Sequence, residues 1–340
     1  MSGYYKGKRV TIKDIAREAG VSAMAVSRAL SNKGGISQET SERIRAIAKK
    51  MNYRPNTIAR SLRKQSTKTI GVIASDSSEL VFSQVLRGVQ DAAFENGYDV
   101  IIANTYQVPE NEKRVLNTMI ERRIDGLIFA APLRSSKKDM EELKHLGMPV
   151  VLLMRSGGLA GIDSVTSDNY NGGYQIVNYL LSTSDSDSAI RFLPLSQSRS
   201  AGMERIAGYQ SALMSHGRQW KEEHSIYCEP TIQDGYNAMK KLLESGFAKG
   251  NVCCGCDLIA IGAIKAVQES GIKIPDEIRI SGYDDIELSD YLCVPLTTIR
   301  QPKYEIGYEG VHLLLERLEN PQMHPKQIVM STELIIRNST

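Results

Sequence analysis

No stretch of about 18 or more apolar residues occurs anywhere in this sequence, so we expect no membrane-spanning helix. The first residues, MSGYYKGKRVTIKD, also lack the apolar core that a secretory signal requires. These two absences predict a soluble, cytoplasmic protein. The chain has 340 residues, of which 41% are hydrophobic. That length exceeds one ordinary domain of about 100–200 residues, so we expect a small domain joined to a larger one.

Cysteine is scarce, and the odd number of cysteines in a long chain argues against a disulfide framework. Cys253 and Cys256 have CxxC spacing, but the five histidines form no cluster that could complete a zinc site. We interpret the CCGC segment as the buried end of a strand, because free cysteine behaves as a small hydrophobic residue. We therefore expect no metal and no cofactor. The cysteines are Cys228, Cys253, Cys254, Cys256 and Cys293.

The short motifs of nucleotide-dependent and hydrolytic enzymes are missing. The sequence contains no GxGxxG after its first strand, no GxxxxGK[ST], no GxSxG and no HExxH. The GGLAG segment, Gly157–Gly161, follows a strand but lacks the spacing for dinucleotide binding. We predict no catalytic residues and no enzymatic activity. An enzyme on a doubly wound fold stays open as an alternative, which turnover of the ligand would reveal.

Charge is distributed unevenly along the chain. The formal net charge is only +3, but residues 1–64 contain 15 Lys and Arg against 4 Asp and Glu. The remaining residues contain 27 basic and 35 acidic side chains. A small basic module attached to an acidic body is typical of a protein that binds the phosphate backbone of nucleic acids.

The basic segment also has the pattern of a folded domain with three helices. Thr11 suits the N-cap of the first helix, Asp14 adds an acidic residue to its first turn, and Gly20 ends it. Ser22 and Ser37 suit the N-caps of the second and third helices. A glycine turn between the first two helices indicates a helix-turn-helix unit. The predicted helices are Thr11–Gly20, Ala23–Leu30 and Gln38–Met51.

A short helix follows this unit. Pro55 suits the first helical position, and the segment Asn56–Leu62 is too short to be stable alone in water. We expect it to become ordered only against DNA or a second copy. The polar segment Gln65–Lys68 marks the domain boundary. The predicted domains are a DNA-binding domain at 1–64, with a hinge helix at 55–62, and an effector-binding domain at 69–340.

In the larger domain, apolar strand-like runs alternate with amphipathic helical stretches, which predicts doubly wound parallel sheets. Two such sets suggest two lobes, with an effector bound in the cleft at the carboxyl ends of the strands. The predicted strands are Thr69–Ala74, Asp99–Ala103, Gly126–Phe129, Val150–Leu153, Ile190–Leu193, Ser225–Cys228, Val252–Cys256 and Ile278–Tyr283. Examples of the predicted helices are Phe82–Asn96, Glu110–Arg122, Lys137–Leu146, Glu204–Ser215 and Leu258–Ser270.

The segments TIKDIAREAGVSAMAVSRALSN and NYRPNTIARSLR strongly resemble the lac repressor–galactose repressor (LacI/GalR) family, and the resemblance continues to ELIIRNST at the C-terminus. It implies an N-terminal all-α helix-turn-helix domain and an α/β sensor domain with two lobes, similar to sugar-binding periplasmic proteins. By analogy, the first lobe comprises about 69–162 and 298–325, and the second about 163–297 and 326–340. One of three crossovers between the lobes would be Pro295–Pro302.

The resemblance also implies which residues contact DNA. The second helix would enter the major groove with Ala23, Met24 and Arg28 at base edges, and Arg can bind guanine through two hydrogen bonds. Small polar residues would contact phosphates, and Leu62 would be the wedge that kinks the minor groove. Thr is frequent in the family where this chain has Ala25. The predicted DNA-binding residues are Thr11, Ser22, Ala23, Met24, Ser27, Arg28, Asn32, Asn56, Ala59 and Leu62.

Effector contacts are likewise implied by the resemblance. Arginines and aspartates would bind hydroxyl groups, and aromatic rings would stack on the ligand. Asp284 is interpreted instead as a residue that shapes its loop, and Glu79 stands where Asn is frequent in the family. Several arginines near one cleft also allow an anionic effector. The predicted effector-binding residues are Phe82, Arg155, Asp168, Arg199, Arg205, Tyr227, Asp257 and Gln301.

These observations predict an allosteric repressor of carbohydrate-metabolism genes that binds a pseudo-palindromic operator as a homodimer. Its effector would be a sugar, sugar acid or sugar phosphate. Because the sequence ends at Thr340 without heptads, we expect a dimer rather than a tetramer. A free solute-binding protein is disfavoured, since it would need a signal peptide and no DNA domain. The sequence does not separate a repressor from an activator or an architectural DNA-binding protein.

Overall fold

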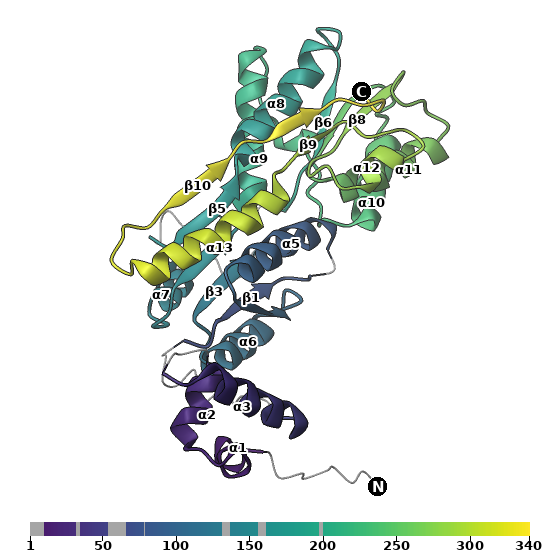
Figure 1. Cartoon of the computed structure of the whole chain (residues 1–340). Coiled ribbons are helices and arrows are strands. Elements are labelled where there is room, and N and C mark those ends of the chain that lie inside the picture. Colours follow the sequence, from purple (N-terminus) through teal and green to yellow (C-terminus); the bar gives the residue numbers. More distant parts are fainter. Residues whose placement is uncertain are drawn as a thin grey trace. The chain divides into compact units, whose positions relative to one another are not determined.

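The computed structural model describes residues 10–31, 35–53, 66–77, 79–130, 137–155, 161–196 and 200–340. The chain divides into two compact units, Met1–Thr67 and Lys68–Thr340 (Figure 1). Within the described residues, no helix is long and apolar enough to cross a membrane.

The first unit contains three short helices around one small core. Thr11 and Asp14 form a capping box at the first helix, and Gly20 ends it in the left-handed conformation with φ 63°. Ile15, Val26 and Ile44 are fully buried and bring the helices together. The helix-turn-helix prediction is confirmed. The helices are α1 (Ile12–Ala19), α2 (Ala23–Leu30) and α3 (Gln38–Lys50).

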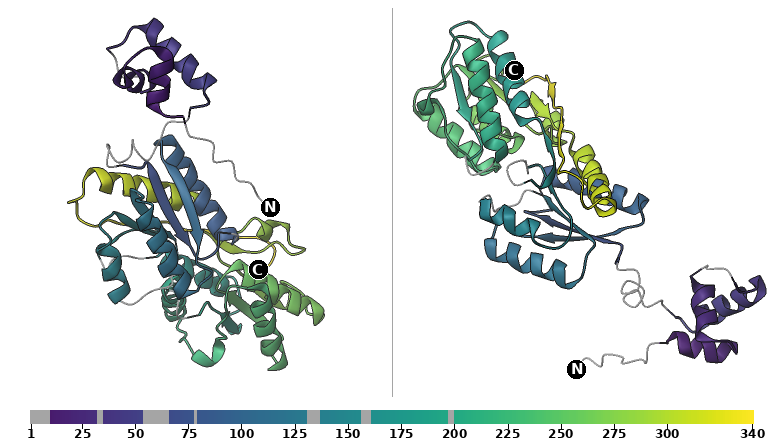
Figure 2. Two further views of the ribbon diagram at one scale, coloured as in Figure 1. Left: turned by 90° about the horizontal axis from the view of Figure 1, so that it is seen from below. Right: turned by 90° about the vertical axis from the view of Figure 1, so that its left-hand side faces the viewer.

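The first lobe of the second unit is a parallel six-stranded sheet in the order β10-β5-β4-β3-β1-β2. Helices α5 and α13 pack on one face of the sheet and α6 and α7 on the other (Figure 2). The strands are β1 (Thr69–Ala74), β2 (Asp99–Asn104), β3 (Gly126–Ala130), β4 (Val150–Leu153), β5 (Asp163–Ser167) and β10 (Gln327–Met330). The helices are α5 (Leu80–Glu95), α6 (Pro109–Glu121), α7 (Lys137–Lys144) and α13 (Lys303–Glu319).

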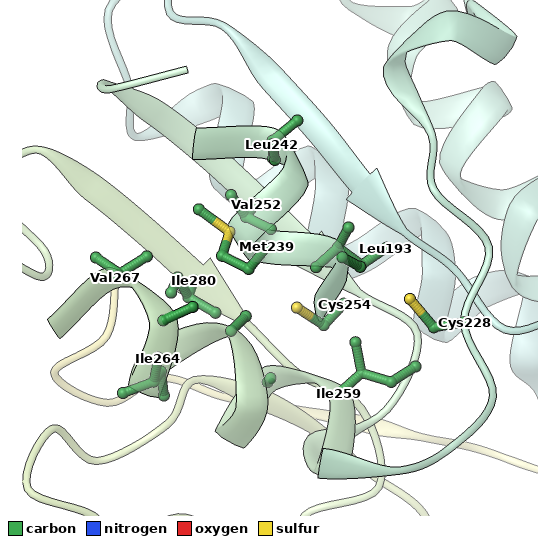
Figure 3. Close-up of a cluster of buried hydrophobic side chains, with 14 of the residues drawn as sticks. Leu193, Cys228, Met239, Leu242, Val252, Cys254, Ile259, Ile264, Val267 and Ile280 are labelled. Atoms are coloured by element: carbon green, nitrogen blue, oxygen red, sulfur yellow. The ribbon is translucent and has the colours of Figure 1, made fainter. Parts of the chain in front are cut away.

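The second lobe has a parallel three-stranded sheet with helices on both faces. Cys228 and Cys254 lie among aliphatic side chains of its core, which agrees with the interpretation of CCGC as a buried segment (Figure 3). The predicted strand Ser225–Cys228 forms only two isolated bridges, to Phe192 and Leu195. The elements are β6 (Ile190–Leu193), β7 (Gly250–Cys254), β8 (Ile278–Ser281), α8 (Asn169–Ser182), α9 (Ser200–Ser215), η2 (Glu222–His224), α10 (Ile232–Glu244), α11 (Asp257–Glu269) and α12 (Leu288–Tyr291).

The chain passes between the lobes three times. Strand β9 (Thr298–Arg300) pairs with β11 (Glu333–Ile335) in an antiparallel ribbon at two of these crossovers. The expected lobe limits near residues 162 and 325 need correction, because β5 and β10 pair within the first lobe's sheet. The first and third crossovers therefore come after Ser167 and Met330.

Helices α5 and α13 cross at very short range. A Cβ atom on Gly307 of α13 would lie 1.9 Å from the carbonyl oxygen of Val85, and one on Gly88 of α5 would lie 2.1 Å from that of Tyr304. Only glycine allows the two backbones to approach this closely. The contact fixes α13, whose first residue is Lys303, against the first lobe.

Candidate functional site

The outer face of α2 carries the side chains predicted to read DNA. Ala23, Met24 and Arg28 are exposed, and Met24 retains 67% of its accessible surface. Ser27 is partly buried. The structure thus brings three predicted base-contacting residues to one accessible helix surface, which an approaching major groove can reach.

Other predicted DNA-binding residues have local structural partners. The Ser22 hydroxyl accepts a hydrogen bond from the Ala25 amide at 3.2 Å, and Thr11 bonds with Asp14. Both residues remain exposed at helix N-termini, where small polar side chains suit phosphate contacts. Asn32, Asn56, Ala59 and Leu62 lie outside the described residues.

A cavity of about 370 Å³ lies between the two lobes of the second unit. Its wall follows the carboxyl ends of β1, β2, β4, β6, β7 and β8, the usual position of a ligand site in parallel sheets. The lining combines apolar side chains with a few charged and amide groups. The lining residues are Ser75, Glu79, Leu80, Val81, Phe82, Gln107, Met154, Arg155, Leu195, Ser200, Ala201, Arg205, Glu229, Pro230, Cys256, Leu258, Asp284, Ile286 and Gln301.

Arg205 is buried in the cavity wall with its guanidinium held on several sides. Its Nε donates to Asn169 Oδ1 at 3.0 Å, and one terminal nitrogen donates to the Gly255 carbonyl at 2.6 Å. The other terminal nitrogen lies 3.5 Å from Asp284 Oδ1, and the guanidinium lies 3.5 Å from the centre of the Tyr283 ring. These contacts fix the guanidinium before any ligand arrives, which lowers the entropic cost of binding.

Gln301 connects this wall to the first lobe. Its Nε2 donates to Asp284 Oδ1 at 2.5 Å, while its Oε1 accepts from the Ser167 hydroxyl at 2.5 Å. Because Ser167 ends β5 and Asp284 follows β8, the amide of Gln301 bridges the two lobes beside the cavity. If one lobe moves relative to the other, the hydrogen bonds from Ser167 to Gln301 and from Gln301 to Asp284 must therefore stretch or break.

The two aspartates are placed differently from what the sequence predicted. Asp284 lines the cavity, whereas Asp257 is fully buried and is absent from the lining. The Asp257 carboxylate accepts hydrogen bonds from the Ile286 amide at 2.9 Å, the Ser289 hydroxyl at 2.8 Å and the Thr298 hydroxyl at 2.6 Å. With these partners Asp257 helps to fix the loop that carries Asp284, and the assignment of the effector contact to one of the two aspartates stays a prediction.

Of the other predicted effector contacts, Phe82, Arg155, Arg205 and Gln301 line the cavity, and Arg199 lies outside the described residues. Asp168 instead caps α8, where its Oδ1 accepts from the Asn171 amide at 2.9 Å. Tyr227 packs against the core of the second lobe and is not part of the lining. Cys256 belongs to the core of the second lobe, as predicted, and also contributes to the cavity. Among the residues that the structure describes, no group of three or more His, Cys, Asp or Glu could hold a metal ion.

Burial controls the ionisation of both aspartates. It raises the pKa of Asp257 to about 7, helped by the nearby Asp284 carboxylate and opposed by the hydrogen bonds from Thr298, Ile286 and Ser289. Burial also raises the pKa of Asp284, against the opposing charges of Arg205 and Lys303.

The raised pKa of Asp257 predicts a pH effect on stability. A carboxyl that holds its proton more tightly in the folded protein stabilises the fold at low pH and loses that contribution as the pH rises through about 7. In the Asp257→Asn variant this group cannot titrate. We expect the stability of the natural protein, relative to this variant, to fall from about pH 4 to about pH 7. Urea unfolding of both proteins across this range measures the difference, and parallel profiles would contradict the prediction.

Comparison with known proteins identifies the family. A profile described as bacterial regulatory proteins of the lacI family matches residues 11–56. A second profile, periplasmic binding proteins and sugar binding domain of the LacI family, matches residues 67–338. The chain belongs to the LacI family. This assignment confirms the resemblance seen in the sequence and makes the protein a DNA-binding transcriptional regulator with a sensor domain for small molecules.

Other LacI family members resemble this chain over nearly its whole length. The HTH-type transcriptional repressor PurR of Vibrio campbellii is 32% identical over 336 residues, which cover 97% of this chain and 98% of the relative. The lac repressor dimer bound to operator and the anti-inducer ONPF has a TM-score of 0.88 and 25% identity, covering 98% and 99% of the two chains. The transcriptional regulator CelR in complex with cellobiose has a TM-score of 0.75 and 26% identity, covering 98% and 100%. The predicted fold class is therefore confirmed.

Proposed function

We propose that this protein is a repressor of carbohydrate-metabolism genes whose operator affinity is controlled by a small, neutral polyhydroxyl effector. The observation that carries the proposal is the cavity between the lobes, where Arg205, Asp284 and Gln301 meet beside apolar side chains. A guanidinium, a carboxylate and an amide can together bind several hydroxyl groups, while Phe82 and Leu195 can pack against the carbon face of a sugar ring.

The charge of Arg205 favours a neutral effector over a sugar acid or phosphate. Its guanidinium is already compensated by Asp284 at 3.5 Å, and burial makes any uncompensated charge costly. An anionic ligand at this point would meet the Asp284 carboxylate as well as the guanidinium. A sugar hydroxyl can donate to the carboxylate and accept from the guanidinium at the same time.

The mechanism we propose is linkage between two sites in a homodimer. Two copies of α2 would contact the two halves of a pseudo-palindromic operator. Effector binding would change the orientation of the two lobes relative to each other. This movement would change the free energy of operator binding, typically by about 1–3 kcal/mol. Such a regulator works at the chromosome, hence in the cytoplasm, and its role requires no cofactor and no catalysis. The lac repressor dimer on its operator and the CelR–cellobiose complex support this proposal by analogy.

Two measurements test the proposed function. A thermal-shift screen of sugars, sugar acids, sugar phosphates and nucleobases, followed by calorimetry, identifies the effector class. Fluorescence anisotropy on an operator selected from random DNA then compares affinity with and without the best ligand. We expect a neutral sugar to bind best and to change operator affinity about tenfold. Tighter binding of the acid or phosphate would discard the neutral class, and an unchanged operator affinity would discard the regulation. A reporter gene distinguishes repression from activation.

DNA affinity should depend strongly on salt. Residues 1–64 carry 15 Lys and Arg, and every phosphate contact releases counterions. Two basic side chains are already used within the fold, because Arg43 donates to the Ala19 carbonyl and Arg45 to the Ala29 carbonyl. With about six phosphate contacts, we expect affinity to fall roughly a thousandfold between about 50 and 200 mM salt. Anisotropy over this range provides the measurement, and a flat double-logarithmic plot would remove the DNA-binding claim.

The variant Leu62→Ala should weaken binding to the operator and spare binding to random DNA. This prediction rests on the sequence and its family resemblance. The apolar wedge would stabilise a kinked minor groove, whereas non-specific binding depends on Lys and Arg contacts to phosphates. We expect an operator-affinity loss of about tenfold or more, with an unchanged salt slope on scrambled DNA. Gel-shift assays on both duplexes separate the two effects. Equal losses on both would make Leu62 a folding residue.

A further inference from the structure

The consecutive residues Asp284 and Asp285 line two different cavities. Asp284 lines the effector cavity, and Asp285 lines a second cavity of about 460 Å³ beside the crossovers. Both residues have positive φ, 116° at Asp284 and 49° at Asp285. Such conformations cost roughly 1–3 kcal/mol each in a residue with a side chain and persist only where the surroundings hold them. The position of the Asp284 carboxylate therefore depends on whatever fixes this turn.

Two arginines donate hydrogen bonds to the Asp285 carboxylate, one to each oxygen. Arg300 Nε donates to it at 2.6 Å, and a terminal nitrogen of Arg337 donates at 2.8 Å. Burial alone would raise the pKa of Asp285, but these hydrogen bonds outweigh that effect and lower it. These two hydrogen bonds anchor the side chain of Asp285.

Lys303 binds the two backbone carbonyls of the turn. Its Nζ donates to the carbonyl of Asp284 and, at 3.1 Å, to the carbonyl of Asp285. Lys303 is the first residue of α13 and is 3% exposed. Because α13 packs against α5 and the sheet of the first lobe, this ammonium joins the first lobe to the cavity wall of the second.

A lysine in this position is energetically unusual. Burial lowers the pKa of Lys303, although the charges of Asp284, Asp257 and Asp285 oppose the shift. Burying an ammonium group is costly unless it is paired and hydrogen-bonded. Replacing Lys303 with an apolar residue would leave the carbonyls of Asp284 and Asp285 without this donor and would remove a positive charge close to three carboxylates. The ammonium is therefore placed where its two hydrogen bonds define the backbone of the turn.

We propose that Lys303 is a positioning residue, which holds Asp284 in the effector cavity and couples its movement to α13 of the first lobe. An effector that pulls on the Asp284 carboxylate displaces the carbonyls to which Lys303 is bound. The displacement then reaches α13 through Lys303, in addition to the route through β9, whose Ile299 carbonyl accepts from the Asp284 amide. The part concerning the effector rests on the proposed function, whereas the tie between Lys303 and the turn does not.

Hydrogen exchange in the full-length protein tests the tie without any ligand. The Asp284 amide donates to the Ile299 carbonyl at 2.8 Å and the Ile286 amide to Asp257 Oδ2 at 2.9 Å, so both are protected when the turn is fixed. We expect Lys303→Met to speed exchange in residues 284–286 about tenfold or more. The Asn251 amide, bonded to the Ala189 carbonyl in the same lobe, should exchange as before. Lys265→Met, which alters an exposed lysine of α11, is the matched control.

The coupling is measured with the sugar that gives the largest thermal shift. The quantity compared is the ratio of operator affinities with and without this sugar. In Lys303→Met we expect this ratio to fall toward one. Operator binding without sugar should persist in the variant. Unchanged exchange at residues 284–286, or exchange that rises equally at Asn251, would overturn the positioning role. A full regulatory response in the variant would overturn the coupling. If no sugar binds, the proposed function fails, and the exchange result alone decides the role of Lys303.

Discussion

The variant Asp284→Asn is expected to lose effector affinity by about a hundredfold while retaining operator binding. The substitution keeps the size of the side chain but removes the charge that lies 3.5 Å from Arg205. It also replaces one of the two carboxylate oxygens with an amide NH2, so only one acceptor oxygen remains for Gln301, Arg205 and the ligand. The loss of one charged hydrogen-bonding partner to a ligand corresponds to about 2–3 kcal/mol.

Asp257→Asn is the matched control, because the same change is made at another buried aspartate close to the cavity. Asp257 accepts hydrogen bonds only from the protein's own groups among the described residues, and none of its atoms lines the cavity. We expect this variant to lose stability and to lose much less effector affinity than Asp284→Asn, because Asp257 can act on the ligand only through the loop that carries Asp284. Calorimetry gives the affinities, and urea unfolding monitored by circular dichroism gives the stabilities. The reverse pattern, with effector affinity lost only in Asp257→Asn, would show that the cavity has been assigned to the wrong carboxylate.

The sequence could not distinguish these two aspartates. Each follows a predicted strand at the edge where ligands bind, so position along the chain favours neither. The difference arises from partners that are remote in sequence. Ser289 and Thr298 close around Asp257, while Lys303 holds the positive-φ turn that aims Asp284 into the cavity. No local pattern encodes these contacts.

Local signals explain what the sequence did predict. The caps at Thr11 and Ser22 and the glycine at Gly20 fix the helix-turn-helix unit within a few residues, so α1 and α2 were predicted closely. Apolar runs likewise predicted β1 and β4 with their observed limits.

Elements without such signals were missed. Strand β5 reads DSVTS, which is largely polar, yet all its residues are buried because its side chains bond within the protein. Asp163 pairs with Arg317 at 2.8 Å, and the Ser164 hydroxyl donates to Gln327 at 2.5 Å. Helix α8 contains Gly172 and Gly173, a pair typical of loops, but α9 approaches so closely that a Cβ on Gly173 would lie 2.4 Å from the Arg205 carbonyl. Tertiary packing overrides local propensity at both places.

The variant Gly307→Ala should destabilise the second unit strongly. Alanine gains about 1 kcal/mol of helix propensity over glycine, so an effect of propensity alone would be stabilising. The new Cβ would, however, lie 1.9 Å from the Val85 carbonyl oxygen and 2.9 Å from its carbon. Both belong to the backbone of α5, which cannot rotate away as a side chain can. The helices must separate, and overpacking of this kind costs about 3 kcal/mol or more. For a unit of this size we expect the Tm to fall by roughly 10 °C.

Gly97→Ala separates this steric effect from the general cost of replacing glycine. Gly97 has φ 71°, and no atom lies within 4 Å of the position of its missing Cβ. Alanine there meets only the left-handed backbone penalty of about 1–2 kcal/mol, so the fall in Tm should be clearly smaller. Differential scanning calorimetry compares both variants with the natural protein. Because α13 begins at Lys303, displacement of the helix should also weaken the effector response in Gly307→Ala, beyond any loss in Gly97→Ala. Equal Tm changes in the two variants would mean that α5 and α13 can separate without penalty, and the close crossing would then not be what fixes α13 to the first lobe.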